Sequence, residues 1–586
     1  MDIFSILSLI GGLALFLYGM DMMSDGLKKL SGGKLESILA SLTSTRFKAF
    51  LLGFGVTALI QSSSATTVML VGFVNAGIMK LGQTLGIIMG ANVGTTVTAW
   101  LLSLTGISDG ASTVLKLFKP SSFTPILAAI GVLMTMVCKK DKNKNFGMIL
   151  IGFSILMFGM DAMSGAMEGL KENESFKSIM GMFKNPILGI LVGTILTAII
   201  QSSSASVGIL QALAATGVIP VSTAIPIILG QNIGTTITPI LSSLNGNTDS
   251  KRVALACLYI KMLGVVVISV IFYVLQYSIG FSFMEEGYMA NAFNIAVIHT
   301  AFNILSTVVL LPFCKLIEKF VVASIKGKKE ETQDAFSSLD ERFLSMPAFA
   351  VETCRQLVND MATRTKKSLL DSIQLLENYD EDVAKQILES ETEIDHYEDK
   401  ISSYLLKVSE KTLSQKDSRE VSQLLHVIGD IERISDHSVN ILEAAQEINE
   451  KRINFSEEAQ QEISVIANAV REILSLSVES LVREDINLAK KVEPLEQIID
   501  KLKYKIKNNH VERLRQGNCT IELGFVLSDL INNFERVSDH CSNIAVCLIE
   551  IENNSFDTHE YLSNVKETGA NEFFEYYDMY KQRYSL

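Results

Sequence analysis

The chain has 586 residues, of which 48% are hydrophobic, and its mean hydropathy of +0.30 is high for a soluble protein of this length. Charge is unevenly divided, because residues 1–320 carry 20 Lys/Arg and 14 Asp/Glu whereas the remainder carries 31 and 50. This acidic balance argues against a nucleic acid partner. The seven cysteines show no CxxC or metal-finger spacing, and their odd number argues against a disulfide framework.

The first part of the chain contains long stretches without any Asp, Glu, Lys or Arg, which predict a membrane domain. The stretches are 49–79, 81–108, 120–138, 185–248, 262–284 and 287–314. One crossing needs about 20 apolar residues, so we expect the chain to turn inside or very near the bilayer within 185–248. Backbone that turns at this depth must be shielded by protein or line a wet cavity.

Helices are expected to follow one another along this domain. A first helix is predicted over about 4–26, without the basic n-region of a cleaved signal, and a counterpart over about 147–166. Further spanning helices are predicted over about 122–138, 252–278 and 290–312. The basic residues that follow 122–138 and 290–312 predict cytoplasmic loops, and they are Lys139, Lys140, Lys142, Lys144, Lys315, Lys319 and Lys326.

An internal repeat runs through the domain at an offset of 140 residues without gaps. YGMD at 18–21 returns as FGMD at 158–161, QSSSA at 61–65 returns at 201–205, and GANVGTT at 90–96 returns as GQNIGTT at 230–236. Secondary transporters are often built from duplicated units, with the binding site where the repeats meet. An odd number of crossings would invert the second copy, and we expect inverted repeats over about 1–138 and 141–312, with re-entrant hairpins at QSSS.

A break in the helix at QSSS would make its polar groups available to bind ions. Ser and Thr hydroxyls and freed carbonyls are oxygen donors suited to Na⁺, and the N-terminus of a half-helix offers N–H groups to an anion. Asn92 and Asn232 add amides, and Gly94 and Gly234 permit close backbone approach. The alternative, that small residues only pack helices together, does not require the same Gln and Asn twice.

Three ionisable residues in the apolar segments have two interpretations each. Asp21 and Asp161, near the C-terminal ends of the first helix and its counterpart, are either intramembrane acids or interfacial residues, and we favour the interface. His299 is either a proton site or a neutral side chain hydrogen-bonded between helices, and we favour the second.

The doubled QSSSAT/QSSSAS and the paired GxNxGTT motifs resemble the type II sodium–phosphate cotransporter family over about 1–315. The resemblance implies Na⁺-coupled movement of inorganic phosphate between two facing QSSS hairpins. The residues it assigns to substrate and sodium are Gln61, Ser62, Ser63, Ser64, Thr66, Asn92, Thr95, Thr96, Gln201, Ser202, Ser203, Ser204, Asn232, Thr235 and Thr236. Thr66-Thr67 becomes Ser206-Val207 in the second copy, which puts equal numbers of Na⁺ sites in the two repeats in doubt.

The acidic second part is predicted to be a helical bundle. After a polar linker over 319–345, apolar residues fall at helical spacing without strand-like alternation. We expect two three-helix units within 346–555, followed by a tail over 556–586. The six helices are predicted over about 348–376, 379–408, 415–449, 457–484, 487–509 and 518–552.

Four ExxxD pairs in this part are candidate metal ligands. ERISDH at 432–437 returns as ERVSDH at 535–540, and ExxxD places both carboxylates of a pair on one helix face. The pairs are Glu391 with Asp395, Glu432 with Asp436, Glu496 with Asp500, and Glu535 with Asp539. Two such helices facing each other would hold hard metal ions. In the alternative, the carboxylates lie on a solvated surface and pair with Arg433 and Arg536.

The repeated ERxxDHxxN signature resembles the PhoU family of phosphate-response regulators over about 345–552. This resemblance implies two three-helix bundles, a divalent or iron-type metal on the ExxxD motifs, and regulation of phosphate handling. Together the two resemblances predict an all-α, polytopic Na⁺/phosphate symporter of the inner (cytoplasmic) membrane, with a transport domain over 1–318 and a cytoplasmic PhoU-like domain.

Other readings of the whole chain are left open. A membrane-anchored phosphate sensor would bind phosphate without moving it. No GxSxG, HExxH or P-loop motif stands in a fitting context, so we do not expect an enzyme. The expected partners are inorganic phosphate, Na⁺ and the lipid bilayer; the direction of flux, the Na⁺ stoichiometry, related oxyanions and a homo-oligomeric state stay undecided.

Overall fold

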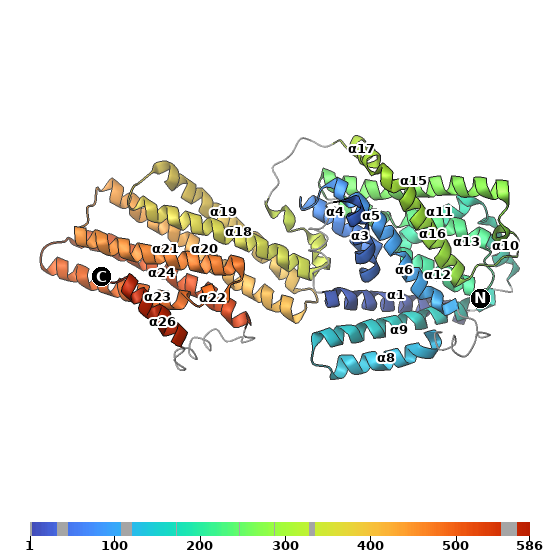
Figure 1. Ribbon diagram of the computed structural model, residues 1–586, viewed down its shortest axis with the longest axis horizontal. Helices are drawn as coiled ribbons and strands as arrows, with labels where there is room; N and C mark the ends of the chain where they lie inside the picture. Colours follow the sequence, from blue (N-terminus) through green and yellow to red (C-terminus); the bar gives the residue numbers. More distant parts are fainter. Residues whose placement is uncertain are drawn as a thin grey trace. The chain divides into compact units, whose positions relative to one another are not determined.

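The structure is a computed structural model that describes residues 3–31, 45–106, 120–170, 173–244, 246–285, 287–326, 335–552 and 571–586 (Figure 1). The chain divides into two compact units, Met1–Phe349 and Ala350–Leu586. The described residues form helices and turns with one isolated bridge, between Pro220 and Met289, so the predicted all-α class is confirmed. Residues 327–334 of the expected linker and 556–570 of the expected tail lie outside the described part.

The first helix of each repeat runs antiparallel to the other. Helix α1 (Ile3–Ser31) packs along α9 (Asp141–Met167), and α8 (Pro120–Val137) lies on the far side of α9 (Figure 1). Gly12 meets the backbone at Gly159, and Gly19 meets it at Gly152. The offset of 140 converts either contact into the other, so a two-fold relation links the helices and the repeats are inverted, as predicted.

Each repeat then contains a helical hairpin followed by a broken helix. The first repeat has α3 (Arg46–Ile60), α4 (Ser63–Asn75), α5 (Leu81–Gly94) and α6 (Thr96–Ser103). The second has α11 (Pro186–Ile200), α12 (Ser203–Ala215), α13 (Val221–Gly234) and α14 (Ile237–Ser243), preceded by α10 (Glu174–Met182). The chain continues through α15 (Thr248–Ile279), α16 (Ala292–Leu310) and α17 (Cys314–Ser324).

Glycines let the broken helix lie close against the hairpin. A Cβ at Gly90 would collide with the carbonyl of Phe50, and a Cβ at Gly230 would collide with the carbonyl of Ile190. These contacts repeat at the offset of 140, so α5 packs on α3 as α13 packs on α11. The repeated glycines therefore bring helices together, which is the use of small residues common in membrane proteins.

Six described helices are long and apolar enough to cross a membrane, or seven if α10 and α11, bent by 104°, count as one span. They include α1, α9, α15 and the segment Ala292–Ser324, all near the predicted positions. Helix α8, which was expected to span, is among the shorter apolar helices over its described residues. The hairpin helices α4 and α12 are also too short to cross, as re-entrant segments require.

The second unit consists of long helices at nearly the predicted positions. They are α18 (Pro347–Leu375), α19 (Glu381–Ser409), α20 (Gln415–Glu450), α21 (Glu457–Arg483), α22 (Ile486–Ala489), α23 (Val492–Arg515) and α24 (Ile521–Glu552). One further helix, α26 (Asn571–Arg583), lies within the expected tail and packs on α23. Its Tyr580 is buried, so this end of the chain belongs to the bundle.

The segment expected as a polar linker is partly folded. Helix α17 extends to Ser324, and two 3-10 turns cover Ala335–Ser338 and Glu341–Ser345. These turns belong to the first unit and pack on α4.

Candidate functional site

Both QSSS motifs break a helix in the same way. Gln61 and Gln201 end α3 and α11 in the left-handed region, at φ values of 60° and 59°. Ser62 and Ser202 then cap α4 and α12, and each hydroxyl accepts a hydrogen bond at 3.2 Å from a backbone N–H three residues later. A non-glycine residue with positive φ is uncommon, and serine is a preferred N-cap, so the motif specifies a sharp reversal twice.

The two hairpin tips line one cavity of about 610 Å³. This volume lies in the range of small-ligand pockets. The hydroxyl of Ser64 reaches the carbonyl oxygen of Gln201 at 3.5 Å, which joins the tip of one repeat to that of the other. The predicted residues on the cavity are Gln61, Ser62, Ser63, Ser64, Gln201, Ser202, Ser203 and Ser204.

Helix α1 supplies the charged groups of the cavity. Asp21, Ser24 and Lys28 line it, and Lys28 pairs with Asp25 at 3.4 Å. Asp21 lines the cavity, whereas its repeat counterpart, Asp161, is exposed and does not line it. The position of both acids at the membrane interface stays a prediction. The sequence did not predict Lys28 as a cavity residue, because it lies in the last turn of α1 and outside both repeated motifs.

Hydroxyl pairs hold each hairpin closed behind its tip. The Thr57 and Thr66 hydroxyls lie 3.0 Å apart, and Thr197 donates to Ser206 at 2.9 Å at the corresponding place in the second repeat. Thr66 also donates to the carbonyl of Ser62 at 3.0 Å and does not line the cavity. Thr66, predicted as a ligand, therefore has a structural role within the hairpin.

The GxNxGTT motifs lie behind the hairpins and do not line the cavity. The hydroxyls of Thr95 and Thr96 donate to the carbonyls of Ala91 and Val93, at 2.9 and 2.7 Å. The hydroxyls of Thr235 and Thr236 and the Asn232 amide likewise donate to carbonyls of α13 and its last turn, whereas Asn92 is half-buried. The structure therefore separates the predicted residues into a cavity set and a set one layer behind it.

Two side chains connect that second layer to the hairpins. Thr98, just after the first motif, donates to the Gln61 side chain at 2.7 Å. Gln231, inside the second motif, donates to the carbonyl of Ser206 at 3.0 Å. The broken helices are therefore hydrogen-bonded to the helices that carry QSSS.

A buried lysine, which sequence reasoning missed, contacts the second motif. Lys261 of α15 is 7% exposed, and its Nζ donates to the Thr235 hydroxyl at 3.1 Å. A single lysine inside an apolar helix was the available signal. His299 of α16 is also buried, and its Nδ1 has no hydrogen-bond partner among the described residues, so the predicted bond between helices is not made at this atom.

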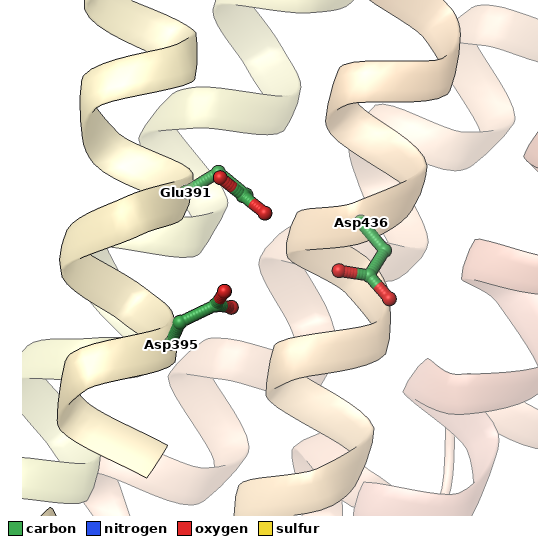
Figure 2. Close-up of side chains that lie close together, drawn as sticks. All are labelled: Glu391, Asp395 and Asp436. Carbon is green, nitrogen blue, oxygen red and sulfur yellow. The ribbon is translucent and has the colours of Figure 1, made fainter. Parts of the chain in front are cut away.

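The second unit brings three of each predicted set of four carboxylates together. Glu391 and Asp395 of α19 face Asp436 of α20, and carboxylate oxygens of the three lie within 4.8 Å of one another (Figure 2). Burial, then the neighbouring carboxylates, raises the pKa of Glu391 and of Asp395. Such a group of oxygens fits a hard divalent cation, whose charge would remove this repulsion.

The second cluster repeats the first. Glu496 and Asp500 of α23 face Asp539 of α24, and carboxylate oxygens of these three residues also lie within 4.8 Å of one another. Burial, followed by the charges of Glu535 and Asp500, raises the pKa of Asp539 to about 6. A hollow of about 880 Å³ opens on this cluster.

Glu432 and Glu535 do not join these clusters, which corrects the prediction of four carboxylates at each. Glu535 pairs with Lys503 at 2.9 Å, and Glu432 lies 3.6 Å from the guanidinium of Arg433. Arg433 thus lies beside Glu432, as the surface interpretation had proposed, whereas Arg536 lies 3.5 Å from Asp539, which stays in its cluster.

Comparisons with known proteins divide the chain at the same place. The Na⁺/Pi-cotransporter family matches residues 15–165 and again 155–290, and the PhoU domain matches 358–445 and 463–548. "Putative inorganic phosphate export protein YjbB" of Salmonella typhimurium is 24% identical over 565 residues, which cover 95% of this chain and 100% of that protein.

Two further relatives match one part each. "Phosphate-specific transport system accessory protein PhoU homolog 1" of Thermotoga maritima is 30% identical over 214 residues, 36% of this chain and 90% of that protein. "Sodium-dependent phosphate transport protein 2A" of Rattus norvegicus is 30% identical over 241 residues, 36% of this chain and 37% of that protein.

Inverted repeats whose hairpin tips line a polar cavity are typical of the secondary-transporter fold. A second helical unit with paired acidic clusters is joined to it. The chain belongs to the Na⁺/Pi-cotransporter family and carries a PhoU domain.

Proposed function

We propose that the chain is a sodium-coupled carrier of inorganic phosphate in the cytoplasmic membrane, and that phosphate binds in the cavity between the hairpin tips. The observation that supports this most is that α4 and α12, each capped by a motif serine, begin on one cavity. Helix N-termini bind anions because their first N–H groups are free and the helix dipole is positive there.

The cavity offers each ion suitable groups. For phosphate it provides the hydroxyls of both serine triplets and the ammonium group of Lys28. For Na⁺ it provides oxygens of the same hydroxyls, the Gln201 carbonyl and the Asp21 carboxylate. An anion and a co-bound cation would lower each other's binding free energy in such a site.

Inverted repeats supply a route across the membrane. In such folds the two repeats exchange conformations, so that one central site opens to each side in turn. The same exchange carries substrate in either direction, and the gradients of Na⁺ and phosphate set the net flux.

The first test is radiolabelled phosphate flux in proteoliposomes with an imposed Na⁺ gradient. We expect uptake and efflux to require Na⁺, and replacement of Na⁺ by choline to abolish both. Equal flux in choline would remove sodium coupling from the proposal. Phosphate binding without counterflow would favour the sensor instead.

The second test addresses the site. Ser63→Ala and Ser203→Ala, which each remove one cavity hydroxyl, should raise the KM for phosphate or lower kcat at least several-fold, as expected for losing about 1–2 kcal/mol of hydrogen bonding. Ser278→Ala is the matched control, because the Ser278 hydroxyl is exposed and bonds its own helix in α15. Equal kinetics of all three variants would place the phosphate elsewhere.

The PhoU domain is proposed to be cytoplasmic and to regulate this transport. Its two acidic clusters are proposed to hold divalent or iron-type cations, with Glu391, Asp395 and Asp436 on one and Glu496, Asp500 and Asp539 on the other. The raised carboxylate pKa values support this proposal, since a bound cation would stabilise the charged forms.

A further inference from the structure

Lys261 is a buried lysine without a carboxylate partner among the described residues. Its side chain is 7% exposed in the middle of α15, and among the described residues its ammonium makes no ion pair. Its hydrogen bond goes to the hydroxyl of Thr235, at 3.1 Å. Burying a charge is costly unless it is compensated, and ionisable groups inside a membrane domain generally mark ion or substrate paths.

Among the residues that the structure describes, the first repeat has no equivalent of Lys261. Thr95 stands where Thr235 stands in the second repeat, and its hydroxyl bonds the carbonyl of Ala91 at 2.9 Å. Among the described residues no Lys or Arg side chain bonds Thr95. The two motifs therefore share their hydroxyls and carbonyls but differ by one positive charge.

The second motif also contains a buried side-chain oxygen that accepts no hydrogen bond from the described residues. Gln231, at the position of Ala91, is fully buried, and its Oε1 has no hydrogen-bond partner among the described residues. Thr235 additionally bonds the carbonyls of Gln231 and Asn232, at 3.2 and 2.7 Å. Amide, hydroxyl and carbonyl oxygens are the groups that an alkali cation takes in place of water.

We propose that the Lys261 ammonium is a tethered substitute for Na⁺ at the second GxNxGTT motif. Two like charges at contact distance in a low-dielectric interior repel by several kcal/mol, so the ammonium excludes Na⁺ from this motif. The first motif, which lacks such a group, remains open to Na⁺. The inverted repeats then bind unequal numbers of Na⁺, and Lys261 fixes the positive charge of the second repeat independently of the Na⁺ concentration.

The test counts bound Na⁺ on the full chain. Equilibrium binding of ²²Na⁺ to purified protein in choline buffer, without phosphate, gives the number of sites per chain. We expect Lys261→Met, which removes the charge and keeps the length, to bind one Na⁺ more than the wild type. Lys261→Arg keeps the charge and should add none, and Lys251→Met, an exposed lysine on the same helix, should also add none. A folded Lys261→Met with the wild-type number of sites overturns the proposal.

A second variant keeps the proposal testable if Lys261→Met does not fold. Thr235→Val should leave the wild-type Na⁺ count unchanged, because the second motif holds an ammonium instead, whereas Thr95→Val should lower it by one. A loss of one Na⁺ in Thr235→Val overturns the proposal.

The consequence of Lys261 for transport rests on the proposed sodium coupling, whereas the number of bound Na⁺ does not. The two proposals can therefore fail separately. If sodium coupling holds, the ratio of ²²Na⁺ to phosphate moved should rise by one in Lys261→Met, and an unchanged ratio counts against the role of Lys261. If wild-type flux is independent of Na⁺, sodium coupling fails, while the binding count still decides the role of Lys261.

Discussion

Gln61 and Gln201 share a backbone conformation but differ in what their side chains contact. The Gln61 amide donates to the carbonyl of Ala58, and its oxygen accepts the Thr98 hydroxyl at 2.7 Å. Gln201 is exposed, and the hydroxyl of Thr238, the counterpart of Thr98, is buried without a partner among the described residues. The two hairpins therefore differ in the hydrogen bonds of their glutamine side chains while sharing their backbone conformation.

This difference predicts unequal costs for the same substitution. Thr98→Val leaves the Gln61 oxygen buried without its donor and should cost about 1–3 kcal/mol of stability. Thr238→Val removes a hydroxyl that has no partner and should be neutral or slightly stabilising. Melting temperatures of the two variants in detergent check this, and equal losses would contradict the asymmetry.

At the scale of helices, one buried ion pair joins α21 to α23. Glu462 accepts two hydrogen bonds from the guanidinium of Arg513, at 2.9 and 2.7 Å, and a third from Asn509. Both charged side chains are nearly inaccessible to solvent. Glu462→Ala leaves the arginine buried and unpaired, so we expect it to cost about 3–5 kcal/mol.

The matched control for this loss lies on α23, the helix that carries Arg513. Glu512 and Arg515 form an exposed pair, and such pairs contribute about 0–1 kcal/mol. Denaturant unfolding of the full chain, followed by circular dichroism, should therefore separate Glu462→Ala from Glu512→Ala. Similar midpoints would show that the buried pair does not stabilise the bundle.

The cluster between α23 and α24 predicts a pH-dependent response to metal. The folded-state pKa of Asp539, about 6, lies above its unfolded value, because burial and nearby carboxylates disfavour its charge. Without metal, stability should fall as the pH rises from about 4 to about 6, and the loss is complete above that. A divalent cation at 100 times its Kd would add about 2.7 kcal/mol at pH 7.

Thermal unfolding between pH 4 and pH 8, with and without Mn²⁺, measures both effects. Asp539→Asn should raise the melting temperature of the metal-free protein at pH 7 and reduce the increase caused by Mn²⁺. Asp578→Asn, an exposed acid of α26, should change neither. A metal response that is independent of Asp539 would exclude this cluster as the site.

At the scale of the whole molecule, local signals were readable from the sequence and long-range partners were not. The doubled QSSS predicted two helix breaks, because a capping serine and an interrupted apolar pattern affect only the few residues around them. The partner of Lys261 depends on which helix packs beside α15, and composition does not determine that. Likewise, Glu432 and Glu535 have the right spacing for metal, but basic neighbours take their carboxylates.

The segment before α18 connects the QSSS helix to the PhoU domain through the chain. Asp340 accepts a hydrogen bond from Asn75 of α4 at 2.8 Å, and Phe343 is fully buried against Phe73, with ring centroids 5.6 Å apart. A Cβ on Gly72 would collide with the ring of Phe343. The C-terminal end of α4 is therefore held in part by residues that immediately precede the PhoU domain.

Phe343→Ala should release that segment. Truncating a buried phenylalanine costs about 3–5 kcal/mol, and proteolysis of a native chain follows the population of the opened state when opening is fast. We expect trypsin to cleave after Arg342 at least ten times faster in Phe343→Ala than in the wild type, at unchanged circular dichroism. Leu339→Ala, at a half-buried position of the same segment, should change the rate much less. Equal cleavage of the two variants would mean that Phe343 does not hold the segment on α4.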